Sequence, residues 1–236
     1  MALTTVLFDL DGTLLPMDND EFTKAYFKLL AKKLLPLDYE PNALVEAVWK
    51  GTYAMIENDG SRTNEEAFWQ TFAQKIGKEN ALDDMPVFME FYRKEFLQAK
   101  AFCGYNPMAP EAVRRIKAAG YRVALATNPI FPSIATESRI GWAGLDPADF
   151  ELFTTYENTS YCKPNPDYYK NVCERLGVLP EECLMVGNDV TDDGSAALTG
   201  MRVFLETDWL INRENKDISV YPNGTFEDLL RYMGLE

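Results

Sequence analysis

The sequence of 236 residues contains no histidine. This absence excludes catalytic mechanisms that need an imidazole, such as Ser-His-Asp, Cys-His and phosphohistidine chemistry. It also excludes the zinc sites that combine cysteine with histidine. Any nucleophile or proton carrier must therefore be a carboxylate, a lysine, a tyrosine, a serine, a threonine or a cysteine.

The sequence also lacks paired cysteines and long apolar runs, and it has fewer basic than acidic residues. The four cysteines form no CxxC pair, which indicates reduced thiols (Cys103, Cys162, Cys173 and Cys183). Lys and Arg number 23 against 37 Asp and Glu, and the net charge of -14 opposes binding to a nucleic acid. The N-terminus lacks the basic segment of a signal peptide, and no apolar run is long enough to span a membrane. We therefore expect a cytoplasmic protein that binds neither nucleic acid nor membrane.

Short apolar runs alternate with segments of helical spacing through the second half of the chain. We expect strands at 121–127, 152–154, 183–187 and 202–205, and helices at 111–119, 133–140, 166–176, 192–199 and 226–233. The β-branched run at 4–8 has the same character as the other strands. This alternation predicts an α/β fold with a Rossmann-like, doubly wound parallel sheet that is covered by helices on both faces.

Residues 17–100 differ, because their apolar side chains recur at helical spacing. We expect about four helices there, separated near 36–41, 58–63 and 77–86. The prediction is an α/β core made of residues 1–16 and 101–236, with an α-helical domain of residues 17–100 inserted after the first strand. The aromatic residues of the insertion are expected to form mainly its own core (Phe22, Tyr26, Trp49, Tyr53, Phe68, Trp69 and Phe91).

Polar residues follow several of the predicted strands at the point where each strand ends. Asp9 and Asp11 follow the first strand, Thr127 and Asn128 the second, and Lys163 lies in the loop after residue 154. The acidic segment 187–193 follows the strand at 183–187. Parallel sheets bind their ligands at the carboxyl ends of the strands, so we expect these residues to meet there.

The two aspartates of the first loop need a partner of opposite charge or a shared proton. Strand alternation places Asp9 and Asp11 on one side, where two carboxylates about 4 Å apart repel by about 4 kcal/mol at an effective dielectric of about 20. Mg²⁺ prefers oxygen ligands, and Asp189 and Asp193 could supply further carboxylates. The alternative is an acidic loop that caps the next helix. Thr127 and Asn128 could likewise donate to an oxyanion or cap a helix.

Taken together, four segments resemble the motifs of the haloacid dehalogenase-like superfamily: Phe8–Leu14, Ala126–Asn128, Lys163–Pro166 and Val186–Asp193. The resemblance implies that Asp9 is the nucleophile, and that Asp11 protonates the leaving group and then activates water. It implies that Thr127 and Lys163 bind the phosphoryl oxygens, to which we add Asn128. It also implies Mg²⁺ bound by the Asp9 side chain, the Asp11 backbone carbonyl and a carboxylate of the fourth segment.

The fourth segment departs from the family pattern, because Asn188 stands where the first aspartate is usual. In one register Asn188 binds the metal with Asp192 or Asp193 in support. In the other register Asp189 is the ligand and Asp193 lies four residues further on. We favour Asp189, because a full negative charge binds Mg²⁺ more strongly than an amide oxygen does.

The expected function is a Mg²⁺-dependent phosphatase that hydrolyses a small phosphorylated metabolite through an aspartyl-phosphate. The resemblance implies that the inserted helical domain is a cap that closes over the cleft. A phosphomutase that uses Asp9 in the same way is an alternative, and a non-catalytic ligand-binding protein is another. The presence of Asp11 disfavours a dehalogenase. The protein could be a monomer or a homodimer, and the sequence does not identify the leaving group.

Overall fold

One parallel sheet forms the centre of the molecule in the computed structural model, which describes residues 1–78 and 81–236. Its order is β2–β1–β3–β4–β5, with all neighbouring strands parallel. The strands are β1 (Thr5–Phe8), β2 (Arg122–Leu125), β3 (Cys183–Gly187), β4 (Arg202–Glu206) and β5 (Asn223–Gly224). The predicted α/β fold with a parallel sheet is therefore confirmed, and β1 lies inside the sheet rather than at an edge.

The sheet is apolar on both faces, because alternate residues of its strands enter two different cores. Val6 and Phe8 of β1 pack into the core that also contains Val113 and Leu229, while Leu7 packs into the core that contains Val172. The first face is therefore covered by α5 (Met108–Ala118) and α8 (Phe226–Tyr232), and the second by α7 (Pro166–Leu176). Helices on both faces of the sheet are the doubly wound arrangement.

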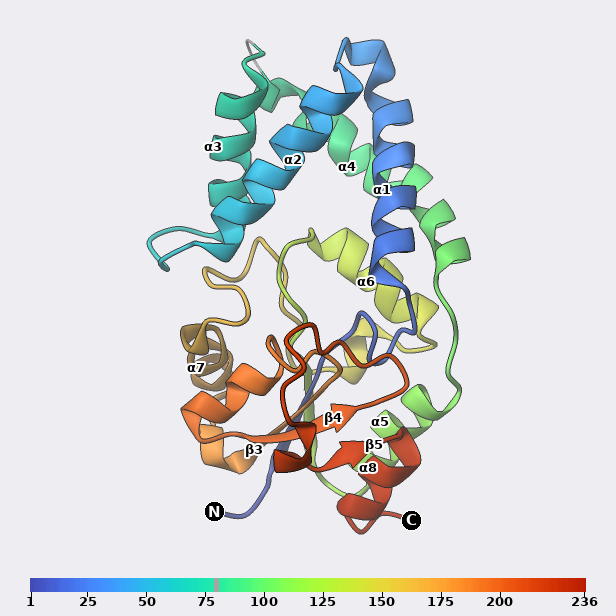
Figure 1. The fold of residues 1–236 in the computed structure, drawn as a ribbon, viewed down its shortest axis with the longest axis vertical. Helices are drawn as coiled ribbons and strands as arrows, with labels where there is room; N and C mark the ends of the chain where they lie inside the picture. Colours follow the sequence, from blue (N-terminus) through green and yellow to red (C-terminus); the bar gives the residue numbers. More distant parts are fainter. Residues whose placement is uncertain (79–80) are drawn as a thin grey trace.

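A bundle of helices lies over the carboxyl ends of the strands (Figure 1). It comprises α1 (Asn19–Leu34), α2 (Pro41–Ile56), α3 (Asn64–Ile76) and α4 (Met85–Arg93), followed by a 3₁₀ segment at Glu95–Phe102. The chain enters and leaves this bundle side by side, because Met17 pairs with Cys103 and the Gly104 N–H donates to the Pro16 carbonyl at 2.7 Å. The chain therefore passes between the sheet and the bundle at one place, and we call the bundle the cap.

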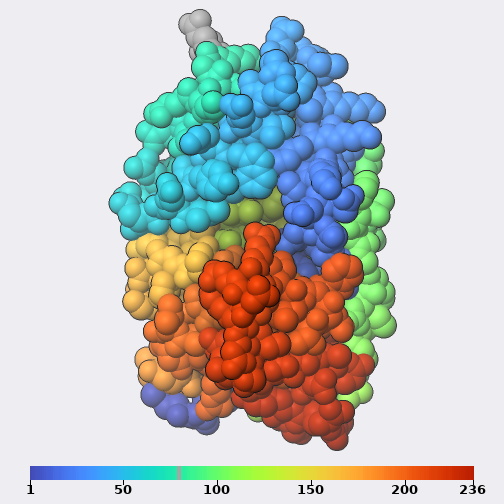
Figure 2. Space-filling view, viewed as in Figure 1, coloured from blue at the N-terminus to red at the C-terminus, as the bar shows by residue number. Residues whose placement is uncertain are grey.

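The helices of the cap begin and end where the local sequence indicates. Asp18 caps α1, and Thr63 and Glu66 form a capping box at the start of α3. Gly51 allows α2 and α3 to approach closely, because a Cβ atom there would lie 2.6 Å from the Phe68 ring. In the space-filling view the cap rests on the core along a broad boundary, which the segment after β4 reaches from below (Figure 2).

Some predicted elements differ from the observed ones. The predicted strand at 152–154 is a single bridge between Phe153 and Leu125, and the predicted helix at 192–199 is a 3₁₀ turn at Gly194–Thr199. The short strand β5, which pairs with β4, was missed because its two residues carry no apolar pattern. None of the helices described in the structure is both long and apolar enough to cross a membrane.

Candidate active site

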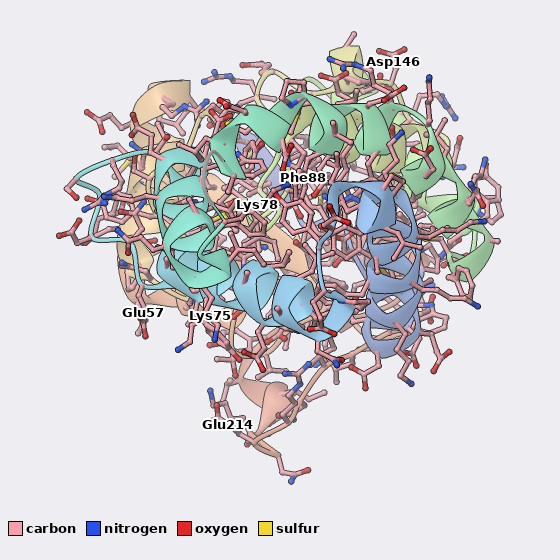
Figure 3. All side chains as sticks on the ribbon, turned by 90° about the horizontal axis from the view of Figure 1, so that it is seen from above. Glu57, Lys75, Lys78, Phe88, Asp146 and Glu214 are labelled. Carbon is pink, nitrogen blue, oxygen red and sulfur yellow. The ribbon has the colours of Figure 1, made fainter. Side chains whose placement is uncertain are left out.

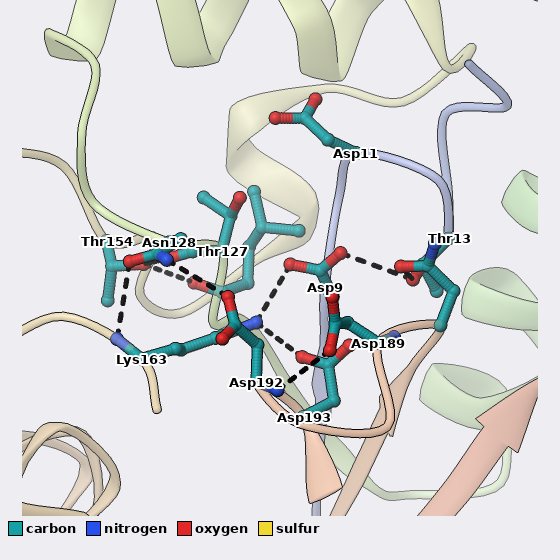
Figure 4. A network of polar contacts seen from close by, with 12 residues as sticks. Asp9, Asp11, Thr13, Thr127, Asn128, Thr154, Lys163, Asp189, Asp192 and Asp193 are labelled. Carbon is teal, nitrogen blue, oxygen red and sulfur yellow. Dashed lines mark hydrogen bonds and ion pairs between the residues drawn. The ribbon is translucent and has the colours of Figure 1, made fainter. Parts of the chain in front are cut away.

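Lys163 lies at the centre of the polar cluster that the strand ends bring together (Figure 4). Its Nζ atom is 2.8 Å from the Asp9 carboxylate and 2.6 Å from the Asp193 carboxylate, and the side chain of Lys163 is only 1% exposed. Burial opposes the charged ammonium, but Asp193 and Asp9 more than offset this effect and hold the pKa of Lys163 well above its usual value. The predicted meeting of the first, third and fourth segments is therefore observed.

Asp11 points away from Asp9 (Figure 4), and its carboxylate pairs with Arg139 of α6 (Ser133–Trp142). The predicted repulsion between the two aspartates is thus reduced by two separate cations, Lys163 and Arg139. Desolvation raises the pKa of Asp11, and Arg139 offsets only part of that rise. The Oδ1 atom of Asp11 is buried and has no hydrogen-bond partner within the described residues.

Arg139 was missed at the sequence level, although it is one of the largest fully buried side chains. Its guanidinium lies 4.4 Å from the centre of the Phe131 ring and also donates to the Ala135 carbonyl and to the Thr136 hydroxyl. These contacts fix the guanidinium in place beside Asp11. The available signal was that Arg139 is the one basic residue of the short helix after the second segment.

The Thr13 hydroxyl connects the first segment to the fourth. Its Oγ1 atom lies 3.3 Å from Asp9 Oδ2 and 3.1 Å from Asn188 Oδ1, so a single hydroxyl group contacts an oxygen of each residue. The amide nitrogen of Asn188 donates to the Trp209 carbonyl at 2.7 Å, which leaves the Asn188 oxygen directed at the Thr13 hydroxyl. Gly12 makes this approach possible, because its φ is +85° and a Cβ atom there would lie 2.2 Å from the Asn188 amide.

Asp189, in contrast, uses its side chain to stabilise its own loop. One carboxylate oxygen accepts hydrogen bonds from the backbone N–H groups of Thr191 and Asp192 at 2.8 and 2.9 Å. The Asp189 N–H donates to Asp193 at 2.9 Å, which links the loop to the Lys163 ion pair. No group of three acidic or cysteine side chains able to hold a metal occurs in the described part of the chain.

The second segment contributes the side chain of Thr127 and the amide of Asn128 to the site. The Thr127 carbonyl accepts hydrogen bonds from Thr154 at 2.6 Å and Tyr168 at 2.8 Å, which fixes the backbone while the Thr127 side chain lines the cavity. Both polar atoms of the Asn128 amide form hydrogen bonds: the oxygen accepts from the Lys163 N–H at 3.3 Å, and the nitrogen donates to Asp192 at 3.2 Å. Thr127 is thus available to a ligand, whereas Asn128 mainly positions its neighbours.

A cavity of about 560 Å³ lies between the cap and the strand ends. Every predicted site residue lines it: Asp9, Asp11, Thr127, Asn128, Lys163, Asn188, Asp189 and Asp193. A volume of this size is typical of small-molecule sites. The arrangement offers a fixed carboxylate, a fixed ammonium, a second carboxyl group and several oxygen donors within one enclosure.

Comparison with known proteins is consistent with this site. The family model for haloacid dehalogenase-like hydrolases matches residues 3–199. A phosphoglycolate phosphatase of Xylella fastidiosa (strain Temecula1) is 30% identical over 199 residues, which cover 84% of this chain and 77% of that protein. The pyrophosphatase PpaX of Bacillus cereus (strain G9842) is 25% identical, with 81% of this chain and 77% of that protein covered.

The fold is also similar to that of a solved structure. The crystal structure of a predicted phosphoglycolate phosphatase from Haemophilus somnus 129pt superimposes with a TM-score of 0.60 and 19% identity, and 98% of each chain is covered. Because the family model spans well over half of the sequence and the four segments meet in one cavity, the chain belongs to the haloacid dehalogenase-like hydrolase family.

Proposed function

We propose that this protein is a Mg²⁺-dependent phosphatase that hydrolyses phosphate monoesters through an aspartyl-phosphate on Asp9. The observation that carries the proposal is the fixed position of Asp9, whose two carboxylate oxygens are contacted by Lys163 and Thr13 at the floor of the cavity. Relatives named as phosphatase and pyrophosphatase, which act on phosphate groups, support the choice of reaction.

In the first step a carboxylate oxygen of Asp9 attacks phosphorus and the bond between phosphorus and the leaving oxygen breaks. Asp11 donates a proton to the leaving oxygen, for which its raised pKa and its Oδ1 atom, unpartnered among the described residues, are suited. In the second step a water molecule attacks phosphorus and gives its proton to Asp11. Asp9 is then released as a carboxylate and inorganic phosphate leaves.

The phosphoryl oxygens are bound by Lys163 and by the hydroxyl group of Thr127. Lys163 is already held beside Asp9, so its charge is in place before the negative charge of the transition state develops. The backbone of Thr127 is anchored by Thr154 and Tyr168, which keeps its hydroxyl directed into the cavity. Asn128 contributes by orienting the Lys163 loop.

The oxygen donors around Asp9 fit Mg²⁺. We assign the metal to the Asp9 carboxylate, the Asp11 backbone carbonyl and one oxygen of the fourth segment. Asn188 Oδ1 is favoured for the last place, because it shares the Thr13 hydroxyl with Asp9 while an oxygen of Asp189 is used by backbone N–H groups. When bound, the ion neutralises phosphoryl charge and polarises the phosphorus–oxygen bonds.

The test is release of phosphate from a panel of monoesters with and without Mg²⁺. We expect turnover that requires the ion and that is lost in Asp9→Asn, while the thermal melting of Asp9→Asn stays close to that of the wild type. Activity that persists in Asp9→Asn, or that is unchanged by removal of divalent ions, would contradict the proposal.

A further inference from the structure

The wall of the cavity that the cap provides is dominated by aromatic rings. Ten of the 30 residues that line the cavity are Phe, Tyr or Trp, and eight of these ten belong to the cap. Phe88 of α4 lies in the middle of the group of cap helices when the molecule is viewed from above (Figure 3). Phe27 and Trp49 lie at the accessible side of this wall, with ring centroids 5.6 Å apart. The leaving group of a substrate bound at Asp9 would face this surface.

The charges of the cavity are unevenly distributed. Among the lining residues that the structure describes, only Lys163 and Arg213 are basic, and Lys163 is already shared by Asp9 and Asp193. Seven lining residues are acidic, including Asp20 of the cap and Glu214 of the loop after β4. A second anionic group on the substrate would therefore find little positive charge and much negative charge.

The cap contributes several polar groups to the cavity, among them Asn19, Thr23 and the Trp69 indole N–H, which has no hydrogen-bond partner within the described residues. Other polar groups of the cap are paired. The Tyr26 and Tyr92 hydroxyls lie 2.9 Å apart, and the Thr52 hydroxyl donates to the Val48 carbonyl at 3.0 Å. The cap therefore offers a leaving group mainly aromatic rings and a few neutral polar groups, and its only charged lining residue within the described part of the chain is the acidic Asp20.

From this distribution we propose that the substrate is a phosphate monoester whose leaving group is uncharged, apolar and large enough to contact the aromatic wall, such as an aryl-alkyl alcohol. The proposal rests on the phosphatase function proposed above and specifies its substrate class. It separates this protein from the relatives named after phosphoglycolate and pyrophosphate, whose substrates carry a second anionic group next to the phosphoryl group.

The size of the cavity agrees with this class. About 560 Å³ is in the range of sites for drug-sized ligands, and it exceeds what a phosphoryl group and a two-carbon acid fill. Each apolar group that moves from water to such a wall contributes to binding in proportion to its area. An aromatic leaving group would therefore gain contacts that ethyl or glycolyl groups cannot make.

The experiment compares kcat/KM for four esters of primary alcohols: 2-phenylethyl phosphate, ethyl phosphate, phosphoglycolate and phosphocholine. We expect 2-phenylethyl phosphate to exceed the other three by about tenfold or more. Higher kcat/KM for phosphoglycolate or for phosphocholine would overturn the inference and leave the phosphatase function intact. Absence of phosphate release from all four would count against the proposed function.

Binding to Asp9→Asn gives a readout that does not depend on turnover. In a thermal melt with Mg²⁺, 2-phenylethyl phosphate should raise the melting temperature of this variant more than ethyl phosphate does at equal concentration. Equal shifts with the two esters would overturn the inference even if no ester is hydrolysed.

Two matched variants on α2 test the wall itself. Trp49 and Tyr53 are both partly exposed, at 41% and 53%, but only Trp49 lines the cavity. We expect Trp49→Arg to raise kcat/KM for phosphoglycolate and lower it for 2-phenylethyl phosphate, so that their ratio changes by about tenfold. Tyr53→Arg adds the same charge outside the cavity and should leave the ratio unchanged. Equal effects of the two variants would contradict the proposed contact.

Discussion

Replacement of Lys163 by methionine tests whether the ion pairs of the site are as buried as the structure indicates. Methionine keeps much of the side-chain volume but removes the ammonium that lies 2.8 Å from Asp9 and 2.6 Å from Asp193. Two carboxylates would then share an enclosed space without a cation, because the Asp193 side chain is 1% exposed and that of Asp9 10%.

The magnitude follows from these distances. At an effective dielectric of about 20, each charge pair at about 2.7 Å attracts by about 6 kcal/mol before desolvation is subtracted. Desolvation of the ammonium offsets most of that attraction, and removing one partner from a buried pair typically costs about 3–5 kcal/mol. We expect Lys163→Met to lower the free energy of unfolding by that amount at pH 8.

The assay is urea denaturation in a chelating buffer, which prevents divalent ions from taking the place of the ammonium. In the variant the two carboxyl groups would bind protons more readily in the folded than in the unfolded state, so the loss should be smaller at pH 5.5 than at pH 8. Lys170→Met is the control, because Lys170 forms an exposed pair with Asp167 and its removal should have little effect. A loss for Lys163→Met no larger than for Lys170→Met would refute the reasoning.

Three further predictions concern other groups. Burial raises the pKa of Glu206 from 4.5 to about 7, so the stability that this carboxyl group gives at low pH is lost as the pH rises through 7. Glu206→Gln should therefore be more stable than the wild type by about 1–2 kcal/mol at pH 8 and not at pH 4, as measured by urea denaturation, and a pH-independent difference would contradict this. Asn188→Asp should tighten Mg²⁺ binding several-fold in a calorimetric titration, whereas weakening by Asp189→Asn alone would assign the ligand to Asp189. Arg139→Leu should lower kcat at least tenfold with little change in KM in steady-state assays, because it removes the partner of Asp11, and a change in KM alone would argue against this role.

The parallel sheet was predictable because its strands are short, apolar and regularly separated by helices. The strand β1 illustrates this well, since all four of its residues are buried and their alternation serves two cores. The elements whose observed structure differs from the predicted one lack such an apolar pattern. Gly194–Thr199 contains small residues that fit a 3₁₀ turn as well as an α-helix, and β5 is two residues long.

The part of the site that lies at the ends of the strands could be predicted from the sequence. The parallel order of the strands brings Lys163 and Asp193 to Asp9. Their proximity could therefore be predicted without knowledge of side-chain contacts. The partner of Asp11 was not predictable, because Arg139 reaches it from a helix through packing on Phe131. The separate roles of Asn188 and Asp189 likewise depend on loop geometry, which two adjacent polar residues in a sequence do not define.

The central claim is that Asp9 carries the phosphoryl group during turnover. Enzyme quenched with acid during steady-state hydrolysis and then reduced with tritiated borohydride converts an aspartyl-phosphate into labelled homoserine, which peptide mapping can locate. We predict label at residue 9 in the wild type, with Mg²⁺ and substrate both required, and no label in Asp9→Asn. Label at another residue, or undiminished hydrolysis by Asp9→Asn, would contradict the account.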